Sequence, residues 1–248
     1  MTHNTKIRMN IRFIYILLLG FISLNTFAQE APQAVWADSI KIDGNLTDWG
    51  NKTFYTFKNQ DFSYSIANDA NYLYIAIRIS NNVQQLKAIY NGISITTNSE
   101  AKEKTGPTVT FPIPDVAALR AMNSKEKYEK AENNREAGLN LTRAILIKGF
   151  ATIIDGRISL ENNYGIKASA KIDSTDDALN YEAAISLKQL NINSDTPFAL
   201  NLRINDISSV RFMNRNTDLY GQYTSIRPGV ATKVEPGVWN ILKLAKSN

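Results

Sequence analysis

The feature that most limits the fold of this chain is a regular alternation of apolar and polar residues over short segments. In the segment NYLYIAIRIS at 71–80, every second residue from Leu73 to Ile79 is Leu or Ile, and the residues between them are Tyr, Ala and Arg. Successive side chains of a β-strand point to opposite faces, so this pattern predicts a strand with one buried face. It does not fit the 3.6-residue period of a helix.

The same alternation recurs along the chain. The segment 62–67 precedes the turn-forming residues NDAN at 68–71, which predicts a hairpin with 71–80. We also expect a hairpin in which 151–154 turns at Asp155-Gly156 into 157–160. Further strands are predicted at 92–97, 142–148, 165–172, 180–187, 198–204 and 239–244. About ten short strands separated by turn residues favour an all-β fold, an antiparallel β-sandwich of immunoglobulin or jelly-roll type.

Two segments break this rhythm. The segment 115–136 is rich in helix formers and has Asp115 as a possible N-cap, so it predicts one inserted α-helix, apolar in its first turns and charged later. Its charged half is typical of a solvated face, with a partner-binding helix as the alternative. The segment 206–237 reads as a loop of about thirty residues, a length usually tied to function or flexibility.

The N-terminal residues predict a targeting segment. Lys6, Arg8 and Arg12 precede a mostly apolar run at 13–24, and small residues end at Ala28, which together indicate a signal peptide over 1–28. Met9 is an alternative start. We therefore expect a single domain over 29–248 that is secreted or periplasmic. The apolar run is shorter than the 18 to 20 or so residues that span a bilayer, so no integral membrane protein is expected after cleavage.

Composition excludes several kinds of chemistry. The only histidine is His3, inside the predicted signal peptide, and the chain has no cysteine. Ser-His-Asp and Cys-His catalysis, zinc sites, haem ligation, disulfides and a lipidated cysteine are therefore not expected. No pair of carboxylates stands out by its spacing, so we expect no enzyme, with a two-carboxylate glycosidase as the alternative. No basic stripe with interleaved aromatics occurs, so nucleic acid is not an expected partner.

Several segments in order resemble family 9 carbohydrate-binding modules and the related DOMON domains. They are IKIDGNLTDW at 40–49, FSYSIANDANYLYIAIRISN at 62–81, NGISITTNSEAKEKTGPTVTFPIP at 91–114, NYEAAISLKQLNI at 180–192 and GVWNILKL at 237–244. The resemblance implies a secreted antiparallel β-sandwich that often binds sugars and often carries structural calcium. Members of the family clamp a saccharide between two exposed tryptophans, and the chain has Trp36, Trp49 and Trp239.

Candidate binding residues follow from side-chain chemistry. We expect Trp49 and Trp36 to pack, whereas the face of Trp239 is ambiguous because it alternates with both Ile241 and Lys243. Sugar rings stack on flat side chains, and guanidinium groups reach hydroxyls. The candidate ligand-binding residues are Tyr220, Tyr223, Arg211, Arg215 and Trp239; a polar loop over the sandwich edge is the alternative for the first four. Candidate calcium ligands are Asp43, Asn45 and Asp48.

Taken together, the sequence predicts a secreted, non-catalytic protein that binds a carbohydrate. The alternative is a structural or protein-interaction domain of the cell envelope without a sugar ligand.

Overall fold

The computed structural model describes residues 32–115, 117–118, 134–205 and 236–247, which form two six-stranded sheets. Sheet A has the order β1-β3-β4-β10-β9, and β2 pairs with β3 outside this path. Its strands are β1 Val35–Trp36, β2 Tyr55–Phe57, β3 Phe62–Asn68, β4 Tyr72–Ile79, β9 Ile166–Ile172 and β10 Leu179–Ser186. All pairs in this sheet are antiparallel except the short parallel pair of β1 with β3.

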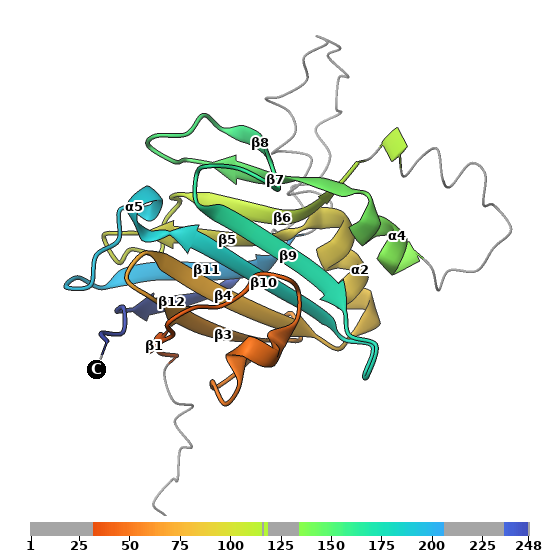
Figure 1. The fold of residues 1–248 in the computed structure, drawn as a ribbon, viewed down its shortest axis with the longest axis horizontal. Helices are drawn as coiled ribbons and strands as arrows, with labels where there is room; N and C mark the ends of the chain where they lie inside the picture. Colours follow the sequence, from red (N-terminus) through yellow and green to blue (C-terminus); the bar gives the residue numbers. More distant parts are fainter. Residues whose placement is uncertain (1–31, 116, 119–133, 206–235, 248) are drawn as a thin grey trace, which may run out of the picture. The chain divides into compact units, whose positions relative to one another are not determined.

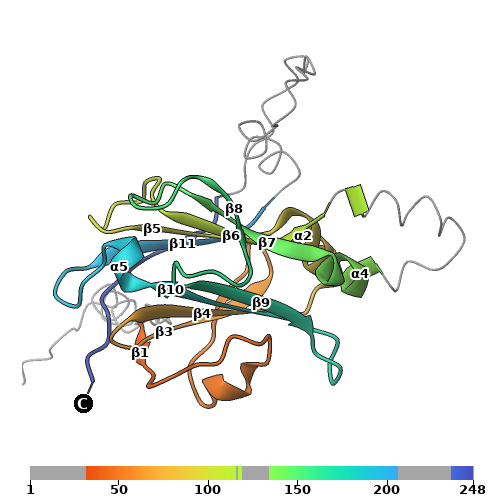
Figure 2. The same cartoon turned by 45° about the horizontal axis from the view of Figure 1, so that its top comes forward.

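Sheet B has the order β12-β11-β5-β6-β7-β8 and is antiparallel throughout. Its strands are β5 Ile93–Asn98, β6 Thr108–Pro114, β7 Thr142–Lys148, β8 Gly156–Ser159, β11 Phe198–Ile204 and β12 Val238–Leu242. Figure 2 shows the two sheets as stacked layers. The predicted all-β sandwich is confirmed.

One large apolar core lies between the sheets. Alternate residues of each strand enter it, for example Ile75 and Ile77 of β4 and Leu200 and Leu202 of β11, all of which are fully buried. Tyr181 of β10 lies in the same core, with its ring centroid 6.1 Å from that of Phe111. The period-two pattern in the sequence therefore arises because each strand presents one face to this core.

The hairpin of β3 and β4 forms as predicted. Its connection is held by Asp69, whose Oδ1 accepts hydrogen bonds from the backbone amides of Asn71 (2.6 Å) and Tyr72 (2.7 Å). This is the self-bonding turn chemistry that favours Asn and Asp at such positions.

The expected strand at 151–154 is wrong. These residues belong to the connection between β7 and β8, in which Ile153 is buried and Ile154 is 91% exposed. The connection is closed by Asp155, whose Oδ1 accepts from the Gly149 amide at 2.6 Å. The turn therefore spans the whole of 149–155, because this bond holds both of its ends.

The structure contains helical elements that the alternation did not predict. They are the 3-10 helix η1 Leu46–Trp49 and the α-helices α2 Asn82–Asn91, α4 Asn134–Asn140 and α5 Leu187–Leu190. Helix α5 directly follows β10, inside the segment NYEAAISLKQLNI at 180–192 that carries part of the family resemblance. Figure 1 shows α2 and α4 side by side at one end of the sandwich and α5 at the other. No helix in the described part is long and apolar enough to cross a membrane.

The expected helix at 115–136 is covered only in part. Asp115 caps its start as predicted, since its Oδ1 accepts from the amides of Ala117 (2.8 Å) and Ala118 (3.1 Å). Residues 116 and 119–133 lie outside the described residues. Near the expected end at 136, the residues Asn134–Asn140 form α4. The expected bounds of the inserted helix stay a prediction.

The N-terminal segment packs on the outer face of sheet A, away from sheet B (Figure 2). It forms a second, smaller apolar cluster in which Ile40 and Trp49 contact outward-facing residues of β3, β4 and β10. Those sheet residues are Ala67, Tyr74, Ala76 and Ala184. Part of sheet A is therefore buried on both faces.

Candidate functional site

The segment IKIDGNLTDW is attached to sheet A by one buried carboxylate. Glu182 lies in the middle of β10 and is fully buried. Its Oε2 accepts from the backbone amides of Asp43 (3.1 Å) and Gly44 (2.7 Å), and its Oε1 accepts from Nε1 of Trp49 (2.8 Å). Burial raises the pKa of the Glu182 carboxyl, and the three N–H donors act in the opposite direction. These contacts make the segment part of the architecture, as expected for Trp49.

Gly44 is required at this turn for two reasons. Its φ is +80°, in the region that only glycine adopts at low cost, and a Cβ at this position would lie 2.8 Å from the Cβ of Lys171 on β9. The Asp-Gly pair in the sequence thus marks a point where backbone approaches the sheet closely.

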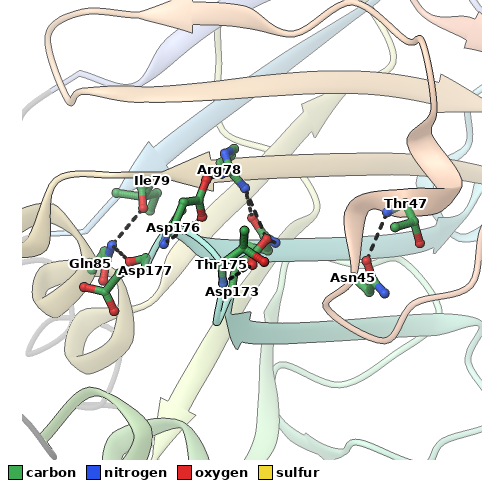
Figure 3. A network of polar contacts seen from close by, with 11 residues as sticks. Asn45, Thr47, Arg78, Ile79, Gln85, Asp173, Thr175, Asp176 and Asp177 are labelled. Carbon is green, nitrogen blue, oxygen red and sulfur yellow. Dashed lines mark hydrogen bonds and ion pairs between the residues drawn. The ribbon is translucent and has the colours of Figure 1, made fainter.

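A second polar network joins one end of sheet A to the helices (Figure 3). Arg78 of β4 forms ion pairs with Asp173 (3.7 Å) and Asp176 in the connection between β9 and β10, and donates to Asn180 Oδ1 at 2.9 Å. Arg135 of α4 pairs with Asp177 (2.8 Å) and donates to Gln85 Oε1 (2.6 Å). The cations of this network are therefore neutralised within the chain.

The outer face of sheet B differs, because it presents rows of polar side chains. Alternate strand residues enter the core, so the remaining ones face outward. One row crosses the sheet in register: Trp239 of β12 is opposite Asn201 of β11, Asn201 is opposite Thr96 of β5, Thr96 is opposite Thr108 of β6, and Thr108 is opposite Lys148 of β7. We call these five residues the Trp239 row.

A second row lies beside the first and is displaced from it by two residues on each strand that the two rows share. It consists of Arg203, Ser94, Thr110, Leu146 and Arg157. Here the hydroxyls of Ser94 and Thr110 are 2.8 Å apart, and Asn205 Nδ2 donates to Ser94 Oγ at 2.8 Å. This row is largely satisfied by its own hydrogen bonds.

In the Trp239 row, by contrast, two polar groups have no partner within the described part of the chain. The side chain of Asn201 is 6% exposed, and neither its amide nor the indole N–H of the half-buried Trp239 forms a hydrogen bond to a described residue. Thr96 and Thr108 share a hydrogen bond of 3.0 Å. The Asn201 amide can therefore form hydrogen bonds with a ligand that lies on the Trp239 ring.

The structure settles the direction of Trp239, which the sequence left ambiguous. It faces outward with Ile241, while Val238 and Leu242 pack on the core. Trp36, expected to be buried, is half-buried, and its Nε1 donates to Asp38 Oδ1 at 3.0 Å. Its strand β1 has only two residues, so its parity with Ile40 and Ile42 is not maintained. The other predicted ligand residues, Tyr220, Tyr223, Arg211 and Arg215, lie outside the described residues.

Each of the three predicted calcium ligands has an oxygen in a local hydrogen bond. Oδ1 of Asp43 accepts from the Asn45 amide (2.9 Å), Oδ1 of Asn45 accepts from the Thr47 amide (3.1 Å), and Oδ2 of Asp48 accepts from the Lys41 amide (3.2 Å). The Lys41 ammonium is 2.8 Å from Asp43 Oδ2. It holds the pKa of the Asp43 carboxyl below its usual range. Calcium binding here stays a prediction.

Sequence reasoning missed Asn201, Thr96, Thr108 and Lys148 as a group. Within the predicted strand 198–204, Asn201 alternates with Leu200 and Leu202, and that alternation was the available signal for a polar, outward-facing residue. The pairing partners of a strand are not encoded in its own residues, so the row could not be assembled before the strand order was known.

Comparison with known proteins gives one structural likeness to report. No protein-family model and no curated protein matches the chain. Among solved structures, it is similar to a family 9 carbohydrate-binding module from Caldicellulosiruptor kristjanssonii in complex with glucose. The identity is 12%, the match covers 88% of this chain and 98% of that one, and the TM-score is 0.36.

Proposed function

We propose that this chain is a secreted or periplasmic, non-catalytic protein that binds a saccharide on the outer face of sheet B. The observation that supports this most is the Trp239 row, which combines an outward-facing indole, an amide without a described partner and two hydroxyls in register across four strands. The resemblance of the sequence to family 9 carbohydrate-binding modules points in the same direction.

The chemistry of the row suits a sugar. A pyranose has an apolar face of C–H groups that can lie on an aromatic ring, and hydroxyls at its edge that need donors and acceptors. Trp239 supplies the ring. The Asn201 amide supplies two donors and an acceptor directly beside it, and Thr96 extends the polar line to the next strand.

The position of Glu182, whose pKa is raised by burial, supports a non-catalytic role. A general acid with a raised pKa must still reach its substrate. Glu182 has such a raised pKa, yet its side chain is fully buried and its two oxygens accept three hydrogen bonds from the chain. It holds the N-terminal segment in place and is not available to a ligand.

Calorimetric titration against a panel of neutral and acidic oligosaccharides tests the proposal. The titrated protein would be the chain from residue 29. In a separate experiment, the chain would be expressed with and without residues 1–28 to show whether the predicted signal peptide directs export and is cleaved. We expect saturable heat with at least one class of glycan. Absence of heat with every glycan would contradict sugar binding.

The alternative is an interaction domain of the cell envelope. It is favoured by α2, whose outer side presents Val83 (63% exposed) and Leu86 (38% exposed) one turn apart. In this case polar substitutions at those two residues would abolish association with an envelope partner, and Trp239→Ala would not. The proposed sugar site predicts the reverse pattern for glycan binding.

A further inference from the structure

The charges on the two faces of the sandwich are distributed unequally. None of the outward-facing residues in the described strands of sheet B is Asp or Glu. The same face carries Lys148 on β7 and Arg157 on β8, both exposed, and Lys243 is exposed directly after β12. With the predicted signal peptide removed, the chain has 25 basic and 23 acidic residues, so this sign bias is a local property.

Several cations elsewhere in the described part form ion pairs within the chain. Arg78 pairs with Asp173 and Asp176, Arg135 with Asp177, and Lys41 with Asp43. No ion pair occurs at Lys148, Arg157 or Lys243 among the described residues. Lys148 and Arg157 lie on the neighbouring strands β7 and β8, and the positive potential of two such cations attracts anions.

Two of these cations stand at the ends of the polar rows. Lys148 ends the row that begins at Trp239, and Arg157 ends the neighbouring row. Four strand spacings separate Trp239 from Lys148, about 19 Å at about 4.8 Å each. That span exceeds one sugar ring, so a ligand that contacts both ends must be an oligosaccharide.

We propose that the saccharide bound on this face is anionic, with carboxylate or sulfate groups that contact Lys148 and Arg157 while a ring lies on Trp239. This inference rests on the proposed function and specifies its ligand class. The outward-facing strand residues include no Asp or Glu that would repel such a ligand, and the nearby Asp155 accepts a hydrogen bond from the Gly149 amide. Arg157 offers a bidentate geometry that suits carboxylate and sulfate.

The test is titration of the intact chain with oligogalacturonates and with the same oligomers methyl-esterified, which removes the charge and keeps the backbone. A sulfated oligosaccharide and its desulfated form provide the second arm, to distinguish the two acidic groups. We expect the acidic form of at least one pair to bind about tenfold more tightly than its neutral form, since two exposed ion pairs each contribute a few-fold. The preference should decrease as salt is raised.

The variant Lys148→Gln/Arg157→Gln should lose this preference and retain binding of the neutral oligomer. The matched control is Lys167→Gln/Lys188→Gln, which removes two exposed charges from β9 and α5 and should keep the preference. Circular dichroism would verify that both variants fold.

The outcomes separate the inference from the function on which it rests. Equal binding of acidic and neutral oligomers, or a preference that survives Lys148→Gln/Arg157→Gln, would overturn the anionic ligand and leave sugar binding intact. No binding of any oligosaccharide would overturn both. Binding to phosphatidylglycerol vesicles without any glycan binding would assign the positive face to a membrane surface and likewise overturn the proposal.

Discussion

The indole N–H of Trp49 donates to Oε1 of Glu182 over 2.8 Å, and both side chains are fully buried although 133 residues separate them in the sequence. This bond and the two backbone amides on Oε2 connect the N-terminal segment to the centre of sheet A. The segment therefore covers part of the outer face of sheet A.

Removing this acceptor should destabilise the fold. In Glu182→Gln the amide N–H₂ group must face either the Trp49 indole N–H or the backbone amides of Asp43 and Gly44, so at least one donor faces another donor. We therefore expect a loss of about 1–3 kcal/mol in the free energy of unfolding. Trp49→Phe removes only one donor and part of the ring. Urea unfolding of both single variants and the double variant should give a coupling energy of about 1–2 kcal/mol. Strict additivity of the two losses would show that the bond contributes nothing.

The stability should also depend on pH through Glu182. Its folded-state pKa is raised by burial above the unfolded value of about 4.3. The stabilisation from this group is therefore fully present below about pH 4.3 and is lost as the pH rises through the folded-state pKa. The pKa values of Asp43 and Asp173 are lowered, so their contributions to stability change with pH in the opposite direction. Both residues are present in wild type and in Glu182→Gln, so their contributions cancel when the two proteins are compared.

The measurement is the difference in unfolding free energy between wild type and Glu182→Gln across pH 3.5 to 8. The advantage of wild type over Glu182→Gln should become smaller as the pH rises. An advantage that grows with pH would mean that the three N–H donors outweigh burial.

Substitution of Gly44 should be costly for both backbone and packing reasons. In Gly44→Ala an alanine must adopt φ +80°, and its Cβ would lie 2.8 Å from Lys171 Cβ. Gly50→Ala has only the conformational cost of a positive φ, because no atom lies within 4 Å of a Cβ at that position. Positive φ at a non-glycine residue costs about 1–3 kcal/mol. We expect thermal unfolding to show the larger loss for Gly44→Ala; an equal loss would mean that the strand moves aside.

Calcium, if it binds at Asp43, Asn45 and Asp48, must compete with the Lys41 ammonium. Lys41→Ala should therefore bind calcium more tightly than wild type, and calcium should raise its thermal midpoint by the larger amount. Lys52→Ala is the control, since the hydrogen bonds of the Lys52 ammonium to described residues go to the backbone oxygens of Asp48 and Trp49 and not to a carboxylate. An unchanged midpoint in all three proteins, with calcium or with a chelator, would remove the predicted site.

Most strands could be predicted from alternation, and the exceptions have physical causes. β6 was not predicted as a strand because Pro112 and Pro114 interrupt its pattern, and the structure accommodates them where the register with β7 shifts. Helix α2 was missed although Asn81 caps it and Gly92 ends it. Its buried face includes Gln85, whose amide bonds Ile79 and Asp177, so the apolar period is broken by a polar core residue.

The site was predictable only residue by residue. Trp239 was a candidate from its chemistry, but its direction required the β11–β12 register, and its neighbour Asn201 became relevant only once the pairing was known. Glu182 was seen as a strand residue in NYEAAISL, and nothing local connects it with Trp49. Contacts that far apart in sequence depend on the assembled sandwich.

The most direct test of the account compares two half-buried tryptophans as ligand platforms. Glycan binding by wild type, Trp239→Ala and Trp36→Ala would be measured by calorimetry with the oligosaccharide that gives the strongest heat. We expect Trp239→Ala to lose about tenfold or more in affinity, as for a central aromatic contact, and Trp36→Ala to bind like wild type. Unchanged affinity in Trp239→Ala would contradict a saccharide site on the outer face of sheet B.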